Sequence, residues 1–237
     1  MTFPFDAPSY RDHRSQCHVL ATTPARHPAL WEQFLDGAEE SYERHGVAAA
    51  LEMSEIRDGN TTALFFAALD RSGQMVGGVR AQGPYSSVEQ SHALVEFAEY
   101  PEGRRHVLTM LDDRIGHGVV ELKSAWVAHD APRGRAVTAM IAESPAYSTA
   151  LLGARYALAT AASHVRAAWL GTGAVVATQI EPIPYPDERY RTEVFWWDRT
   201  TLAFDADLTT WRRMRHNTVT LLAHRRAAVE LPEAVAS

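Results

Sequence analysis

The sequence predicts a single α+β domain built around a mixed, mostly antiparallel sheet. Stretches rich in β-branched and aromatic residues alternate with amphipathic helical stretches, and one pair of strands is joined by a short turn as a hairpin. The length of 237 residues suits one large domain, and the sequence contains no internal repeat and no low-complexity linker.

The first part of the chain predicts an arm, a strand and a helix. Residues 1–16 are polar and lack a sustained period, so we expect a flexible N-terminal arm ahead of a domain that spans residues 17–237. A short strand is expected at 17–22. Apolar residues then recur at helical spacing over 28–46 with a proline in the first turn, which predicts an amphipathic helix.

The clearest local pattern is a β-hairpin. The apolar runs Ala63–Leu69 and Met75–Ala81 are separated by Asp70–Gly73, a typical turn sequence. Gly77 and Gly78 inside the second run indicate a bulge or the close approach of another backbone.

The remaining elements follow from periodicity and from helix-start signals. Ser144 followed by Pro145 is typical of an N-cap and a first helical position, and it opens an Ala-rich stretch. The expected elements are a helix over 103–113, a strand over Val119–Val127, a long helix over 144–163, a strand at Arg166–Leu170, a strand over 191–197 and a helix over 208–226.

Composition excludes several function classes. Lys plus Arg total 23 against 29 Asp plus Glu, a net charge of −6, which is a poor basis for general nucleic-acid binding. The single cysteine, Cys17, can form no internal disulfide, and no His, Cys or acidic cluster has metal-ligand spacing. The start shows no signal-peptide pattern and no long apolar run suggests a membrane span, so we expect a cytoplasmic protein.

Two short motifs carry possible chemistry. Glu121 and Lys123 share one face of an otherwise apolar strand, so if that face is covered the two charges must pair with each other or act on a substrate. A modest surface ion pair is the alternative. The loop Arg133–Ala136 could present backbone N–H groups and arginines to a phosphate, although such a loop is also common at a surface. Gly171–Gly173 is read as a turn.

Three segments together resemble the GCN5-related N-acetyltransferase (GNAT) superfamily, in particular its autoinducer-synthase and long-chain N-acyl-amino-acid-synthase branch. Phe65–Pro84 resembles the paired strands before the active site there, Val119–Val127 resembles the Glu-bearing central strand, and Ser144–Leu170 resembles the helix and strand that follow. The resemblance covers about residues 60–170, with a weaker match over 185–197.

The chain departs from that branch at two places. Autoinducer synthases usually carry an arginine three residues after the strand glutamate, where this sequence has Ser124, which argues against homoserine-lactone synthesis. The donor loop of the superfamily is only approximated from Arg133, because Ala136 and Thr138 stand where small glycines are usual, which argues against ordinary acetyl-CoA use.

The resemblance implies central strands that splay around a pantetheine arm, and a set of roles for the residues beside them. Glu121 would be the general base, Lys123 would hold an acceptor carboxylate or neutralise Glu121, and Tyr190 would protonate the leaving thiolate. The implied donor contacts are the backbone near Trp126, Val127 and Ala128, and the loop residues Arg133, Gly134, Arg135, Ala136 and Val137. The implied substrate contacts are Arg80, Ser124 and Phe66.

The implied function is transfer of an acyl group, medium or long, from acyl-CoA or an acyl carrier protein to a small amine such as an amino acid, without a metal. Large aromatic residues in the sheet segments, and alanines on the helix expected behind the gap, favour a long chain. Two alternatives stay open: an acetyl-CoA-dependent GNAT acetyltransferase of a metabolite, and a non-catalytic GNAT-fold protein that binds a lipid or thioester.

Overall fold

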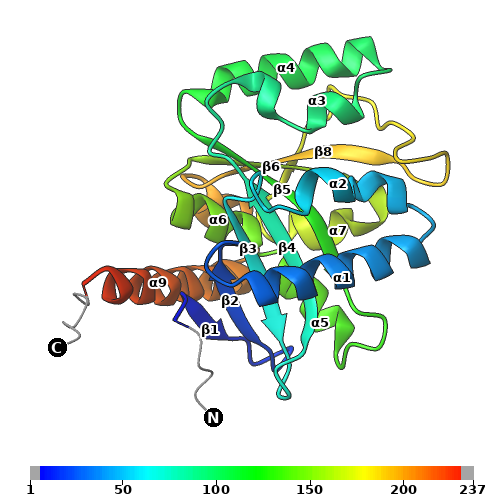
Figure 1. Cartoon of the computed structure of the whole chain (residues 1–237). Helices are drawn as coiled ribbons and strands as arrows, with labels where there is room; N and C mark the ends of the chain where they lie inside the picture. The colour runs from blue at the N-terminus through cyan, green and yellow to red at the C-terminus, as the bar shows by residue number, and fades with distance from the viewer. Residues whose placement is uncertain (1–5, 231–237) are drawn as a thin grey trace.

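The computed structural model describes residues 6–230, in which eight strands form one sheet in the order β1-β2-β3-β4-β5-β6-β8-β7 (Figure 1). The strands are β1 (Ser9–Arg11), β2 (His18–Thr22), β3 (Leu64–Leu69), β4 (Met75–Gln82), β5 (Val119–Val127), β6 (Tyr156–Ala162), β7 (Val175–Val176) and β8 (Thr192–Asp198). The helices are α1 (Pro28–Arg44), α2 (Met53–Ile56), α3 (Ala93–Glu96), α4 (Pro101–Ile115), α5 (Gly134–Ile141), α6 (Ser144–Leu152), α7 (Arg166–Leu170), α8 (Leu202–Asp205) and α9 (Leu208–Glu230). None of the helices within residues 6–230 has the length and hydropathy that a membrane crossing needs.

The sheet is mixed and mostly antiparallel, and its one parallel contact is short. β5 and β6 pair in parallel only between Val119–Glu121 and Tyr156–Leu158. Beyond that point β6 pairs with β8 along its whole length, while β5 continues beside β4. A gap therefore opens between Leu122–Val127 and Ala159–Ala162, which confirms the expected single α+β domain with splayed central strands.

Helices cover both faces of the sheet. α1 lies across one face, where its apolar side packs on β3, β4 and Trp126, and α3 and α4 cover the other half of the same face (Figure 1). α5, α6 and α9 cover the opposite face and bury the residues between β1 and β8. Gly78 permits this packing of α1, since a Cβ there would lie 2.7 Å from the ring of Phe34.

A β-bulge in β5 changes which side chains share a face. Gly78 pairs with Trp126 and Arg80 pairs with Lys123, so one extra residue of β5 is accommodated opposite Val79, and Ser124 takes a φ of +53°. One extra residue reverses the alternation beyond it. Trp126 therefore packs on α1, on the face of Glu121, rather than on the face of Val120 and Leu122 that simple alternation predicts.

The segment after Ser144 corrects the expectation of one long helix. α6 ends at Leu152 because Gly153 adopts a left-handed conformation with φ +72°, and the chain then returns as β6. The alanines of residues 154–161 thus lie largely in a central strand, where burial between β5 and β8 outweighs their helix propensity. Arg166–Leu170, expected as a strand, is the helix α7.

The expected N-terminal arm is also corrected in part. Ser9–Arg11 forms β1 and pairs with β2 at the edge of the sheet. Asp12 is buried, and its carboxylate accepts hydrogen bonds from the backbone N–H and the hydroxyl of Ser15 at 2.8 and 2.7 Å. Residues 9–15 therefore belong to the domain, through the pairing of β1, the buried ring of Tyr10 and these polar contacts. Residues 1–5 of the expected arm lie outside the described residues.

Candidate functional site

A cavity of about 400 Å³ lies where β5 and β6 diverge. Its walls come from the end of α1 and the loop after it, β4, β5, α5, β6, the segment around α7 and the loop before β8. Part of the lining is apolar, namely Val79, Leu122, Ile141, Val165, Ala168 and Trp169. The charged and phenolic part is Tyr42, Glu52, Arg80, Glu96, Lys123, Tyr185 and Tyr190.

Glu121, the expected general base, does not line the cavity. Its side chain is fully buried. Its carboxylate accepts four hydrogen bonds: from the hydroxyls of Tyr85 and Ser91 at 2.9 and 2.8 Å, and from the backbone N–H groups of His92 and Ala93 at 3.0 and 3.1 Å. Burial, followed by the neighbouring Glu121 charge, raises the pKa of Tyr85 well above its ordinary value. Glu121 thus fastens the start of α3 to β5.

Lys123 lines the cavity and forms a buried ion pair with Glu96 of α3. Burial alone would raise the pKa of Glu96, but the charge of Lys123 and the contact with His92 together lower it to about 2. Burial likewise opposes the charge on Lys123, but Glu96 and then Glu121 raise its pKa. Both groups of the pair are therefore ionised at neutral pH, and the partner of Lys123 is Glu96 instead of Glu121.

Arg80 is a buried cation without an ion pair. Its residue is 3% exposed, and within residues 6–230 no carboxylate forms a salt bridge with its guanidinium. Its Nε donates a 3.1 Å hydrogen bond to the Ser124 hydroxyl, which the bulge of β5 turns toward it. Burial lowers the pKa of Arg80. A charge held this way is suited to an anionic ligand group, because an unpaired buried charge is costly.

Glu52 and His92 add a group that the sequence interpretation missed. Glu52 immediately precedes α2 in the left-handed region, with φ +50° and ψ +49°, an unusual conformation for a residue with a Cβ. Its carboxylate lies 2.5 Å from Nε2 of His92, and Nδ1 of the same ring lies 3.1 Å from Glu96. Because Glu96 is ionised and can only accept, Nδ1 carries the proton that it donates.

Two tyrosines line the cavity from the loop before β8. Tyr190, the expected proton donor, is half-buried, and its hydroxyl lies 3.5 Å from the carbonyl oxygen of His45. Burial, followed by the charge of Glu96, raises the pKa of Tyr185 to about 12. Tyr185 therefore keeps its proton at neutral pH and is a second possible donor.

The predicted donor loop does not reach the cavity. Arg133 and Arg135 are exposed, Val137 is in the core, and none of residues 133–137 is part of the cavity wall. Three N–H groups at the start of α5 are already bonded: that of Gly134 to the carbonyl of Ala131, and those of Ala136 and Val137 to the carbonyl of Arg133. These bonds leave the helix terminus with fewer free donors for a phosphate than the loop sequence implied.

Of the backbone N–H groups expected to bind the oxyanion, some already have partners within the sheet. The N–H of Ala128 donates to Val76 of β4 at 3.0 Å, so it is not free for a ligand. Because alternate N–H groups of a strand point in opposite directions, that of Val127 points away from β4 and toward the gap. Phe66, an expected substrate contact, is instead a core residue of β3 that packs near Tyr147 with ring centroids 6.0 Å apart.

The cavity residues Glu52, Glu96 and Tyr185, and the His92 ring behind them, come from three separate segments. Glu52 lies before α2, Glu96 lies in α3, and Tyr185 lies in the loop before β8. No spacing within the sequence connects them, so only the fold brings them together. Within the described residues, no three His, Cys, Asp or Glu side chains are arranged to hold a metal ion.

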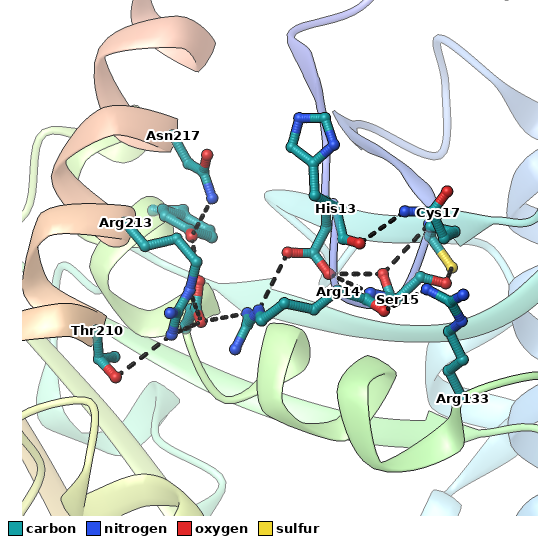
Figure 2. A network of polar contacts seen from close by, with 12 residues as sticks. His13, Arg14, Ser15, Cys17, Arg133, Thr210, Arg213 and Asn217 are labelled. Atoms are coloured by element: carbon teal, nitrogen blue, oxygen red, sulfur yellow. Dashed lines mark hydrogen bonds and ion pairs between the residues drawn. The ribbon is translucent and has the colours of Figure 1, made fainter.

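A second buried polar network lies outside the cavity and joins three elements (Figure 2). The fully buried Glu143, between α5 and α6, accepts hydrogen bonds from Arg14 at 2.6 Å, from Nε of Arg213 on α9 at 2.8 Å and from the Tyr147 hydroxyl at 2.7 Å. Arg133 donates to the carbonyl oxygen of Arg14 at 3.1 Å. The network therefore ties α5 to the N-terminal segment and to α9.

Comparison with known proteins gives sequence relatives and fold neighbours. No family model matches the chain. The uncharacterized proteins Rv1356c of Mycobacterium tuberculosis and Mb1391c of Mycobacterium bovis are each 46% identical to it over 193 residues, which cover 81% of this chain and 73% of theirs.

Solved structures show the same fold at low sequence identity. FeeM, an N-acyl amino acid synthase from uncultured soil microbes, matches with a TM-score of 0.58 and 12% identity over 82% of this chain and 97% of its own. An acyl-CoA N-acyltransferase from Pseudomonas aeruginosa matches with a TM-score of 0.51 and 13% identity over 76% and 98%. The acyl-homoserine lactone synthase BjaI matches with a TM-score of 0.51 and 12% identity over 89% and 99%. The likeness shows a GNAT-like fold.

Proposed function

This chain belongs to one family with the mycobacterial proteins Rv1356c and Mb1391c and has a GNAT-like fold, and from that premise we propose that it is an N-acyltransferase. The donor is a thioester of CoA or of an acyl carrier protein, and the acceptor is a small amine that carries a carboxylate, such as an amino acid. The observation that carries the proposal is the cavity between the diverging ends of β5 and β6, with the unpaired guanidinium of Arg80 in its wall.

The gap between the strands accounts for the donor. A thioester placed there meets the N–H of Val127, which points into the gap and is suited to stabilise the oxyanion of a tetrahedral intermediate. The apolar wall beside it favours an acyl chain longer than acetyl, since each buried methylene contributes about 0.8 kcal/mol. This wall distinguishes the proposal from an acetyl-CoA-dependent enzyme.

The buried cation accounts for the acceptor. Arg80 donates through Nε to Ser124 and through Nη1 to the Thr61 hydroxyl at 3.5 Å, and a substrate carboxylate would satisfy the N–H groups that remain. Lys123 adds positive charge to the same wall, although its own charge is already matched by Glu96. In this arrangement Arg80 and Ser124 bind the acceptor, whereas Glu121 holds α3 in position.

The reaction also needs a proton for the leaving thiolate. Tyr185 and Tyr190 both line the cavity, and a phenol that keeps its proton at neutral pH can supply it. The exposed Arg133 and Arg135 lie outside the cavity and are proposed to meet the phosphates of CoA or the acidic surface of a carrier protein. A salt-sensitive KM for a carrier donor would distinguish these two donors.

The test is an acyl-transfer assay with a defined panel. Acyl-CoAs and acyl carrier proteins with chains from two to sixteen carbons are incubated with the twenty amino acids, and products are identified by mass spectrometry. Arg80→Gln is expected to raise the KM for the acceptor about tenfold to hundredfold, because a hydrogen bond to a charged group contributes about 1.5–3 kcal/mol. The KM for the donor should not change.

The control is Arg71→Gln, on the exposed turn between β3 and β4. A wild-type protein that binds acyl thioesters but forms no product with any acceptor would refute the transferase and favour the non-catalytic thioester-binding alternative.

A further inference from the structure

Two carboxylates, Glu52 and Glu96, line the polar part of the cavity and contact opposite sides of the His92 ring. Among the lysines and arginines of the described residues, Lys123 forms a salt bridge with Glu96, and none forms one with Glu52. Burial makes a carboxylate without a cationic partner costly, so this part of the cavity is suited to an ammonium group.

An unpartnered oxygen points to the same kind of ligand. Oε2 of Glu96 is buried and has no hydrogen-bond partner within the described residues, although Oε1 contacts both Lys123 and His92. Buried carboxylate oxygens are nearly always paired, so an orphaned one in a cavity wall is suited to a ligand N–H. Glu52 stands beside it across the His92 ring, and its side chain is 28% exposed.

The backbone at Glu52 also indicates a functional position. Glu52 holds a left-handed conformation that glycine would adopt without the steric penalty of a Cβ. Strain of this kind persists where the surrounding structure holds the residue in place, and it gathers at functional sites. Here it directs a carboxylate to the cavity and to His92 together.

From these observations we propose that Glu52 is the catalytic base that takes the proton from the acceptor ammonium, an inference that rests on the proposed function. The ammonium gives one proton to Glu52, and the nitrogen lone pair then forms a bond to the thioester carbonyl carbon. The C–S bond breaks as the tetrahedral intermediate collapses, and the thiolate leaves with its electron pair. The thiolate gains a proton as the nitrogen loses its second proton. Glu52 then releases the proton that it took to water in the cavity.

The other titratable groups facing this point are less suited to the role. The His92 ring is not part of the cavity wall, and its two nitrogens contact the carboxylates of Glu52 and Glu96. Glu121 uses its oxygens in four hydrogen bonds outside the cavity wall. Glu96 has a pKa of about 2 and is too weak a base, while Lys123 has a raised pKa and stays protonated. Burial raises the pKa of Tyr42, and Tyr185 has a pKa of about 12, so both phenols are proton donors at neutral pH.

The test compares Glu52→Gln with the wild type across pH. The reaction is decanoyl-CoA with whichever of the twenty amino acids gives the most product. We expect kcat at pH 7 to fall about 10²- to 10⁴-fold, the usual contribution of general base catalysis, with an unchanged KM for decanoyl-CoA. The loss should shrink steadily as the pH approaches the pKa of the free amine, because a neutral amine needs no base.

Two further variants separate chemistry from folding. Glu55→Gln changes an exposed carboxylate three residues away on α2 and should leave the activity at the wild-type level. Glu52→Gly removes the carboxylate but suits the left-handed backbone, so it should lose activity while it unfolds at the same or a higher temperature. An active wild type with full activity in Glu52→Gln, or with an equal loss at every pH, would overturn this inference alone. A wild type without product for any donor and acceptor would overturn the proposed function and this inference together.

Discussion

Lys123 is the only lysine of the sequence, and it forms an ion pair with Glu96 in the wall of the cavity. Glu96 reaches it from α3, whose start is held by the carboxylate of Glu121 through the N–H groups of His92 and Ala93. The two carboxylates therefore have different roles. Glu121 positions α3, and Glu96, which α3 carries, neutralises the charge of Lys123.

The ionisation of Glu96 predicts a pH-dependent stability. Its pKa is about 2 in the folded protein against an ordinary value of 4.5. A depressed pKa stabilises the fold fully above the ordinary value, and this contribution is lost as the pH falls from about 4.5 to about 2. At 1.36 kcal/mol per unit the contribution is about 3 kcal/mol at neutral pH. Glu96→Gln should lower the free energy of unfolding by about this amount at pH 7, and the difference should narrow below pH 4.

Urea unfolding of the wild type and Glu96→Gln at a series of pH values from 2.5 to 7 measures this difference. Glu99→Gln, an exposed change on the segment after α3, serves as the control and should change the free energy by less than about 0.5 kcal/mol. A deficit of the same size at every pH would show that Glu96 acts through packing and not through its charge.

Single residues show which features of the site could be predicted from the sequence and which could not. An acidic and a basic residue in an apolar strand left two interpretations open, buried charges or a surface ion pair, and the structure has both side chains largely buried at Glu121 and Lys123. Their partners could not be predicted, because those lie about thirty positions away and meet the strand only after the sheet and α3 have formed. Gly77 and Gly78 indicated a bulge or a close approach in β4, and the register shift does lie next to Gly78. The position of the extra residue in β5 could not be predicted, since nothing in the local sequence requires a positive φ at Ser124.

At the scale of elements, local signals were reliable where they agreed with the tertiary structure. The hairpin of β3 and β4 and the helix α1 are confirmed, because turn residues and apolar period both specify them. The prediction of one long helix after Ser144 was wrong. Alanine favours a helix locally, but here the alanines are the small buried side chains of a central strand. Tertiary packing therefore outweighed local helix propensity in residues 156–162.

The Glu143 network predicts which contact holds α5 and α6 in place. Glu143→Gln leaves two arginines without their carboxylate in a site where the glutamate side chain is fully buried. Breaking a fully buried pair typically lowers the free energy of unfolding by about 3–5 kcal/mol. Because the side chains of Arg14 and Arg213 remain 35% and 24% exposed, we expect a smaller decrease here, of about 2 kcal/mol. Chemical denaturation measures it.

The matched control for this prediction is Glu40→Gln. Glu40 forms an exposed ion pair with Arg44 one turn along α1, and such a pair contributes about 0.3–0.5 kcal/mol. Equal effects of Glu143→Gln and Glu40→Gln on the free energy of unfolding would mean that the network does not stabilise the junction of α5 and α6.

At the scale of the molecule, the parallel contact between β5 and β6 divides the sheet. On one face, the first part, β1 to β5, packs on α1, whereas the buried residues of β6 and β8 on that face lie in one cluster with residues of α3 and α4. The two parts share only the short ladder at Val119–Glu121, and beyond it the diverging ends of β5 and β6 line the cavity. The GNAT resemblance predicted this opening, but its lining depends on loops that have no recognisable sequence pattern.

The apolar part of the cavity wall predicts a control on acyl chain length. Ala168 on α7 lines the cavity, whereas its neighbour Ala167 is exposed and points elsewhere. Ala168→Leu should fill space that an acyl chain would occupy, and each methylene that no longer fits should weaken donor binding by about 0.8 kcal/mol, about fourfold in KM. The preferred acyl-CoA should therefore become shorter in a competition assay with mixed chain lengths, while Ala167→Leu keeps the wild-type preference. If both variants prefer the same chain length as the wild type, the acyl chain does not lie between β5 and α7, and the donor must enter the gap from another side.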